Sequence, residues 1–415
     1  MILYIIYFLL SPVLWVLTMV ISLFNEKIQI RQNQYHSLLN KSIEKIKATN
    51  KSVLLFHAAS NGELEQIKPI FRIIDRERYF IFLTISSPSS FKHISENDVD
   101  TYCYQAFDFP WTVNKFFKII RPDKYIITRH DIWPHHIVIS KLYCKNIFLI
   151  NANLPKYSKR SFPIVITLYK YIFRKFDCIY TVSKLMGNKL EKIVGADKIR
   201  IIGDTRFDQI NYRFNNNESL IPLFDNSKNI LFGSIDNNDL PIIFKSLNDN
   251  HTSFINTKLI FVPHEPTEEF MLDIERQLME LKITSSRLTN IDYKDNKIEA
   301  LIVDKIGILA EAYKFSSISY IGCGFGKGVH NVIEPAIYGN MICFGPNYEI
   351  LNEAIELVDN KLASSINNAN ELSSVLKLIN EDDKLNKHKN EMKKYLKTKS
   401  KFSDEIIKDI LCNFA

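Results

Sequence analysis

Two groups of residues in this chain have types and spacings suited to chemistry on a phosphorylated substrate. The first group is Ser60 and Glu63, three positions apart in AASNGELEQIKPIF, just before an apolar run with helical periodicity. Ser-x-x-Glu at such a place is a capping box, which stabilises a helix start without any catalytic role. Glu63 also follows the apolar run 53–58, and open α/β sheets place ligands at the carboxyl ends of their strands. The pattern alone favours the cap, and a catalytic carboxylate is the alternative.

The second group lies in YIGCGFGKGVHNVIEPAIYGNMICFGP, residues 320–346. Its four alternating glycines, at 322, 324, 326 and 328, remove side chains where backbone N–H groups could approach an anion. Their spacing matches neither the dinucleotide fingerprint G-x-G-x-x-G nor a Walker loop, and a tight loop without a ligand is the other interpretation. Glu334-Pro335 followed by Gly339 resembles the nucleotide-sugar site of glycosyltransferases with two Rossmann domains, known as GT-B.

Short apolar runs separated by helix-like segments predict a parallel α/β fold in two halves. In the first half the expected strands are 53–58, 80–86, 101–107, 124–129, 146–152, 178–183 and 199–203. In the second half they are 229–234, 258–263, 300–304, 318–323 and 341–346. We expect two Rossmann-like domains over 25–210 and 230–415, joined by a polar, Asn-rich linker over 211–229, with charged helices at the end of the second.

Residues 1–24 contain no charge, and twenty of them are apolar, which is enough to cross a bilayer as a helix. Lys27, Arg31 and Lys41 follow, and no cleavage site of small residues is present, so a membrane anchor with a cytoplasmic body is expected. Pro12 and the three other residues that are not apolar leave an interfacial helix as the alternative.

Charge is unevenly distributed along the chain. Residues 25–210 hold 30 Lys and Arg against 17 Asp and Glu, a net charge of +13, and residues 211–415 have a net charge of −6. Basic charge next to an anchor indicates a surface that faces anionic headgroups or a phosphorylated lipid, although an ordinary solvated surface is the simpler alternative. No nucleic-acid module is present, so we expect no nucleic-acid partner.

The motifs occur in the order found in one enzyme family. They are HAASNGE (57–63), SPS (87–89), FDFP (107–110), DIWPH (131–135), LINANL (149–154), GDTRFD (203–208), FGS (232–234), VPHEP (262–266), VDKIGILAEAY (303–313) and the glycine-rich loop. With them the chain resembles the 3-deoxy-D-manno-octulosonic acid (Kdo) transferases over about residues 25–365. The resemblance implies a GT-B glycosyltransferase that moves Kdo from CMP-Kdo to lipid A precursor in lipopolysaccharide biosynthesis, at the cytoplasmic face of the inner membrane.

The resemblance also assigns roles to residues. It makes Glu63 the catalytic base that takes the proton of the acceptor hydroxyl, where the positive end of a helix should keep it ionised. Nucleotide-sugar binding falls on Ser234, His264, Gly307, Gly324, Gly326, Asn331 and Glu334. Acceptor binding falls on Ser60, Ser87, Asp131 and Lys156.

We expect no metal and no cofactor besides the CMP-Kdo donor. CMP leaves with its own phosphate charge, and the six cysteines are scattered without a C-x-x-C pair. His264-Glu265 does not continue into the zinc motif H-E-x-x-H.

Some positions depart from the commoner family pattern. Arg129-His130-Asp131 stands where the family has Glu-Thr-Glu, His264-Glu265 where it has Arg-His, and Asn153 replaces an arginine. These departures leave open which acceptor is used and how many sugars are added. Two other classes remain as alternatives: a nucleotide-sugar epimerase, which would have no use for the apolar N-terminus, and a non-catalytic membrane-bound homologue.

Overall fold

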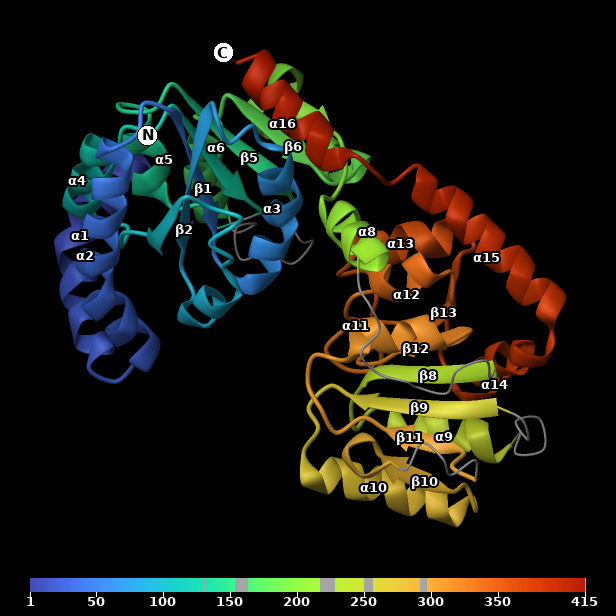
Figure 1. The fold of residues 1–415 in the computed structure, drawn as a ribbon. Helices are drawn as coiled ribbons and strands as arrows, with labels where there is room; N and C mark the ends of the chain where they lie inside the picture. Colours follow the sequence, from blue (N-terminus) through green and yellow to red (C-terminus); the bar gives the residue numbers. More distant parts are fainter. Residues whose placement is uncertain (130, 154–162, 217–227, 250–256, 292–296, 415) are drawn as a thin grey trace. The chain divides into compact units, whose positions relative to one another are not determined.

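The computed structural model describes residues 1–129, 131–153, 163–216, 228–249, 257–291 and 297–414 (Figure 1). The chain forms two compact units, Met1–Gln209 with Lys399–Ala415, and Ile210–Thr398. Each unit is built on a parallel sheet of seven strands with helices between consecutive strands. The predicted fold class, two Rossmann-like α/β domains, is confirmed.

In the first unit the strand order is β3 (Thr101–Tyr104), β2 (Tyr79–Ile85), β1 (Ser52–Ala58), β4 (Lys124–Thr128), β5 (Asn146–Ala152), β6 (Cys178–Thr181) and β7 (Ile199–Ile201). Its strands are apolar on both faces because both faces are covered. Thus Leu55 of β1 faces one core, whereas Leu54 and Phe56 face the other.

Helices cover both faces of this sheet. One face packs against α2 (Glu26–Lys47), α4 (Pro110–Ile120), α5 (Pro134–Ser140), α6 (Pro163–Phe173) and α7 (Lys184–Val194). The other face packs against α3 (Asn61–Ile73) and α16 (Phe402–Cys412). The strand order reverses between β1 and β4, and a ligand crevice is expected at the carboxyl ends of strands at such a switch point.

In the second unit the order is β10 (Ser285–Arg287), β11 (Ala300–Ile302), β9 (Thr257–Pro263), β8 (Lys228–Ile235), β12 (Ile318–Ile321), β13 (Met341–Phe344) and β14 (Ala363–Ser365). One face packs against α9 (Leu240–Asn248), α10 (Glu268–Glu280) and α14 (Ala369–Leu376). The remaining helices are α11 (Leu309–Ala312), α12 (Ile333–Tyr338), α13 (Asn352–Asp359) and α15 (Asp382–Lys397). Here the order reverses between β8 and β12.

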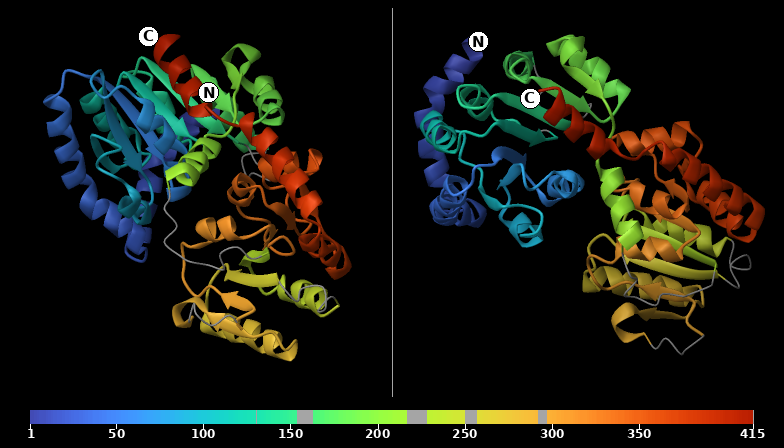
Figure 2. Two further views of the ribbon diagram at one scale, coloured as in Figure 1. Left: turned by 45° about the vertical axis from the view of Figure 1, so that its right-hand side comes forward. Right: turned by 45° about the horizontal axis from the view of Figure 1, so that its top comes forward.

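The C-terminal boundary differs from the expected single domain over 230–415. Helix α16 belongs to the first unit, because Ile406, Ile407 and Ile410 join the core beneath α3. Figure 2 shows this helix, in red, beside the first sheet in both views. The expected linker over 211–229 also begins as helix, since α8 spans Arg206–Asn216; residues 217–227 lie outside the described part.

The N-terminal segment forms helix α1 (Ile2–Ser22). Among the described residues it is the one helix that is long and apolar enough to cross a membrane, by length and composition alone. One side of it contacts the first unit: the Ser11 hydroxyl lies 2.9 Å from Nε2 of His135, and the Tyr7 hydroxyl donates to Asp108 over 2.9 Å. Apolar side chains cover much of the rest and are exposed, among them Leu9, Val13 and Leu17.

Candidate functional site

Glu63 lies in the first turn of α3, just past the carboxyl end of β1. Both halves of a capping arrangement are present: the Glu63 N–H donates to Oγ of Ser60 over 3.4 Å, and Oε2 of Glu63 accepts from the Ala59 N–H over 2.6 Å. The side chain is buried, with 4% of the residue exposed. The predicted cap therefore exists, and the carboxylate sits at the switch point of the sheet.

Burial raises the pKa of Glu63, and the hydrogen bond from Ala59 only partly offsets this. Burial thus outweighs the effect of the helix N-terminus that the sequence led us to expect, and the pKa of Glu63 lies above its ordinary value. Burial in a low-dielectric site disfavours the charged form more strongly than the end of one helix favours it. A raised pKa brings a carboxylate closer to the working pH of a general base.

A hydrogen-bonded pair, the buried His57 and the partly buried Asp131, lies beside Glu63. Nε2 of His57 is 2.8 Å from Oδ2 of Asp131, and Nδ1 lies 3.1 Å from both the carbonyl oxygen and the hydroxyl of Thr84. The Thr84 hydroxyl donates to the Phe56 carbonyl, so the His57 ring lies between the Asp131 carboxylate on one side and the Thr84 oxygens on the other. The ring is fully buried at the end of β1.

The carboxyl group of Asp131 is ionised in this pair. Burial alone would raise its pKa, but hydrogen bonds from His57, Trp133 and Ser86 lower the pKa of Asp131 to about 2. The charge of Asp131 in turn contributes to the raised pKa of Glu63. His57 received no role from the sequence, although it opens the HAASNGE motif; its partner lies 74 positions away.

Other residues predicted for acceptor binding meet at the same sheet edge. The Ser87 N–H donates to the Ala59 carbonyl over 3.0 Å, which ties the turn after β2 to the turn that holds Ser60 and Glu63. Asp131 joins them from the segment after β4. Lys156 lies outside the described residues.

In the second unit, Gly307 and Glu334 line one cavity of about 230 Å³. The complete lining is Ile210, Arg213, Phe214, Gly307, Ala310, Glu311, Glu334, Ile337 and Tyr338. At Gly307, with φ +93°, a Cβ would meet nothing within 4 Å. Two carboxylates and two aromatic rings around open space can hold a group with hydroxyls and a flat face. The sequence patterns did not indicate Arg213 and Phe214, whose segment carries no motif, or Tyr338, which lies between Glu334-Pro335 and Gly339.

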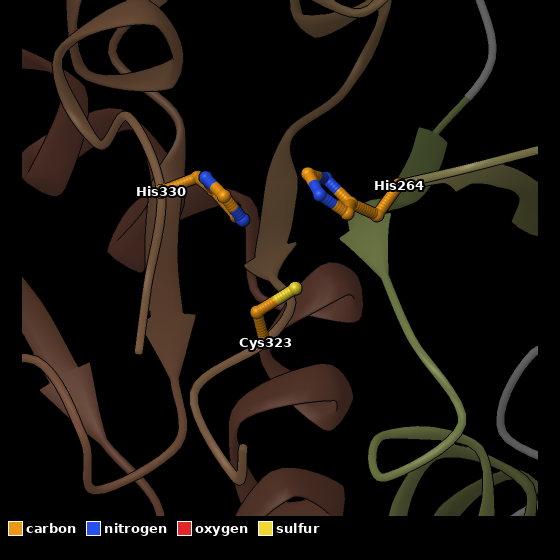
Figure 3. A group of neighbouring side chains, drawn as sticks. All are labelled: His264, Cys323 and His330. Carbon is orange, nitrogen blue, oxygen red and sulfur yellow. The ribbon is translucent and has the colours of Figure 1, made fainter. Parts of the chain in front are cut away.

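Ser234 and His264 form a separate group at the ends of β8 and β9, and Figure 3 shows His264 with its neighbours His330 and Cys323. Oγ of Ser234 lies 3.4 Å from Nδ1 of His264, whose ring stacks on that of His330 with centroids 4.4 Å apart. Cys323 lies below the two rings, and burial, with the nearby Asp236 and Asp239, raises the pKa of its thiol to about 12. His330 was missed, although it directly precedes Asn331.

The glycine-rich loop packs tightly against its own unit. A Cβ on Gly322 would lie 2.3 Å from the Ser234 carbonyl oxygen, and one on Gly324 would lie 2.5 Å from the Gly345 nitrogen. Protein backbone thus fills the space into which a side chain at Gly322 or Gly324 would point, so packing within the unit requires glycine at both positions. Beside Gly326 the neighbour is the Asn238 side chain, at 2.7 Å.

The side chain of Asn331 forms a hydrogen bond with the backbone at the start of α12. Its Oδ1 accepts a hydrogen bond from the Ile333 N–H over 2.9 Å. The residues predicted for nucleotide-sugar binding therefore divide between the cavity, the Ser234 group and this loop.

The two comparisons of sequence point to the same family. The family model described as 3-deoxy-D-manno-octulosonic-acid transferase (kdotransferase) matches residues 31–209. The 3-deoxy-D-manno-octulosonic acid transferase of Rickettsia prowazekii (strain Madrid E) is 25% identical over 368 residues, 87% of this chain and 78% of that protein. The enzyme of the same name from Aquifex aeolicus (strain VF5) is 26% identical over 336 residues, 79% of this chain and 85% of that protein.

Solved structures share the fold. A putative UDP-N-acetylglucosamine 2-epimerase from Listeria monocytogenes aligns with a TM-score of 0.61 at 12% identity, covering 88% of this chain and 97% of that one. A glycosyltransferase from Rickettsia africae ESF-5 aligns with a TM-score of 0.55 at 14% identity, covering 88% of this chain and all of that one. At such identities the likeness concerns the two-domain architecture alone.

Proposed function

We propose a residue-level mechanism for this chain, which belongs to the 3-deoxy-D-manno-octulosonic acid (Kdo) transferase family and moves Kdo from CMP-Kdo to lipid A precursor. Glu63 is the general base: its carboxylate takes the proton of the acceptor hydroxyl as that oxygen attacks the anomeric carbon of Kdo, and CMP leaves. The supporting observation is the buried Glu63 carboxylate at the switch point of the first sheet, with a raised pKa.

The neighbours of Glu63 hold it in place for this role. The Ala59 N–H binds one carboxylate oxygen, which leaves the other oxygen available for a proton. Ser60, Ser87 and Asp131 share the same sheet edge and supply hydroxyl and carboxylate groups that suit a sugar acceptor. Lys156, in the same proposal, contributes positive charge to an acceptor phosphate.

The second unit binds the donor in this proposal. Glu334 accepts hydrogen bonds from the ribose hydroxyls, and the cavity it shares with Gly307 and Tyr338 encloses the nucleoside. Burial and the carboxylates of Glu311 and Glu334 raise the pKa of Tyr338, so its phenol stays protonated and able to donate. Ser234, His264, Asn331 and the backbone at Gly324 and Gly326 complete the proposed nucleotide-sugar site.

The test of the base is Glu63→Gln in the full chain, incubated with CMP-Kdo and lipid A precursor while mass spectrometry counts the added sugars. The amide oxygen can still accept from Ala59 but the amide cannot take a proton, so transfer should fall by roughly 10²-fold to 10⁴-fold with CMP affinity nearly unchanged. Glu65→Gln is the matched control, because Glu65 lies on the same helix and pairs with Lys68. Wild-type turnover by Glu63→Gln would reduce Glu63 to a helix cap.

For the location, we propose the inner membrane with both units in the cytoplasm. The exposed apolar surface of α1 and the positive charge of residues 25–210 support it. The full chain should stay with membranes in 1 M salt, where charge attraction is screened to about 3 Å and apolar burial persists. Release of the full chain by salt alone would contradict anchoring through α1.

A further inference from the structure

We propose that His264, Cys323 and His330 bind a zinc ion. One ligand atom from each of the first three residues lies within 4.8 Å of the others, so the three donors surround a single point. Two imidazoles and a thiolate form a ligand set that zinc prefers over magnesium or calcium.

The three side chains come from three separate turns of the second unit. His264 follows β9, Cys323 follows β12, and His330 lies in the loop before α12. Figure 3 shows the two rings side by side with the Cys323 sulfur pointing toward the space beneath them. Both histidines are solvent-exposed, whereas Cys323 is 2% exposed, so an ion can enter from the histidine side.

The spacing is close to that of a metal site. With Zn–N of ~2.0 Å and Zn–S of ~2.3 Å, donors around a tetrahedral zinc lie about 3.5 Å apart. The present donors lie within 4.8 Å, and small rotations of the two exposed rings can close the difference. The rings are nearly parallel, at 22°, and no backbone movement is needed to turn them about their own side-chain bonds.

Of the two aspartates near Cys323, Asp236 is better placed than Asp239 to approach the ion, although neither belongs to the group formed with the two histidines. Both lie with Cys323 in a second group of close donors. Asp239 is already committed, since one oxygen accepts from the Tyr320 hydroxyl over 2.6 Å and the other from the Cys323 N–H over 2.8 Å. Asp236 is half-buried; one of its oxygens accepts from the Asn238 N–H over 2.8 Å, the other lies 3.3 Å from the Asn238 side-chain amide, and the carboxylate also interacts with the Cys323 thiol. Asp239 instead holds the backbone that presents Cys323, as residues behind metal ligands commonly do.

Short motifs alone gave no sign of zinc in the sequence. Here the ligands are 59 positions apart from His264 to Cys323 and 7 from Cys323 to His330, and the sheet brings them together. Cys323 also adopts a left-handed backbone with φ of 63°, which a glycine would adopt without strain. Cys323→Gly therefore removes the thiol while keeping the turn.

Zinc at this site would compete with the sugar donor CMP-Kdo. This consequence rests on the proposed function. His264 and its contact Ser234 belong to the proposed nucleotide-sugar site, and a ligated His264 can no longer turn toward a nucleotide. Binding releases the Cys323 proton to solvent, and no redox step is involved.

The test is a titration of the metal-free full chain in detergent, without nucleotide. Cobalt should bind once per chain and give the charge-transfer absorption of a cobalt–thiolate bond, and zinc should displace it. Cys323→Gly should lose this absorption and bind zinc at least ~100-fold more weakly, and His330→Gln should weaken zinc binding too. Cys412→Ser is the matched control, because Cys412 is the exposed cysteine and should contribute nothing.

Wild-type zinc affinity in Cys323→Gly, or an absorption that disappears with Cys412→Ser, would overturn the proposal. Because the titration uses no CMP-Kdo, its result is independent of whether the chain transfers Kdo. A separate arm measures CMP affinity: zinc should weaken it in the wild type and not in Cys323→Gly. Equal CMP affinity with and without bound zinc would overturn the competition.

Discussion

Replacing Asp131 with asparagine should destabilise the first unit at neutral pH, because the amide removes the charge that faces the buried His57 ring. The oxygen of the new amide can still accept from Trp133, and the side chain keeps nearly the same volume, so the change isolates the charge. The hydrogen-bond distance of 2.8 Å between His57 and Asp131 and the 20% exposure of the Asp131 side chain place the pair largely away from water.

The magnitude follows from the pKa of Asp131, which is about 2 in the folded protein against an ordinary value of 3.8. A carboxyl group with a lowered pKa stabilises the folded state above its ordinary pKa, and this contribution is lost as the pH falls through the folded value. At about 1.4 kcal/mol for each pKa unit, the charged form stabilises the fold by about 2 kcal/mol at pH 7.

The assay is equilibrium urea unfolding of the full chain in detergent, followed by tryptophan fluorescence. All three tryptophans, Trp15, Trp111 and Trp133, belong to the first unit, so the signal reports the unit that holds the pair. Asp197→Asn is the control: Asp197 is an exposed aspartate of the same unit, and its loss should change the free energy of unfolding by less than ~0.5 kcal/mol.

The pH dependence provides the decisive comparison. The difference between wild type and Asp131→Asn should be about 2 kcal/mol at pH 7 and should narrow as the pH is lowered toward 3, where Asp131 begins to protonate. A loss of the same size at both pH values would show that the variant acts through packing. A loss below ~0.5 kcal/mol at pH 7 would refute the electrostatic argument.

Three further predictions concern the two candidate sites. In a pH–rate profile, kcat/KM should fall on the acid side with an apparent pKa above 4.5, the ordinary glutamate value, because the buried Glu63 must lose its proton to act. An apparent pKa at or below 4.5 would contradict the assignment. Glu334→Ala should weaken CMP binding by roughly 10-fold or more in calorimetry, the loss of a hydrogen bond to a charged group, and unchanged affinity would remove Glu334 from the site. Gly322→Ala should destabilise the second unit by ~1–3 kcal/mol in thermal unfolding, because its Cβ would lie 2.3 Å from the Ser234 carbonyl; Gly62→Ala, whose nearest contact is 3.9 Å, should have little effect.

Much of the fold was predictable because parallel strands buried on both faces are apolar throughout. Every strand expected from an apolar run is present, from VLLFHA to MICFGP. The two strands that were missed, β10 and β14, have three residues each at the sheet edges and contain serines. A short edge strand is held by one neighbour's hydrogen bonds, and its own residues carry no apolar pattern.

The unit that α16 joins could not be predicted in the same way. Its isoleucines show that one side of the helix is buried, and the same pattern would fit either sheet. Similarly, Ser-x-x-Glu predicted the cap on α3, since Ser60 and Glu63 are neighbours on one turn. Whether the Glu63 carboxylate is buried depends on residues far along the chain.

Sequence by itself therefore determined what local patterns encode: the two α/β halves, the strands and their polarity, the apolar helix at the N-terminus and the place of Glu63 at a strand end. Tertiary structure alone decided which distant residues meet. His57 faces Asp131 across 74 positions, and Cys323 lies close to His264 and His330. The reason is that side-chain charge, pKa and ligation depend on what surrounds a group in space, and neighbours at a sheet edge come from strands whose order only the folded sheet defines.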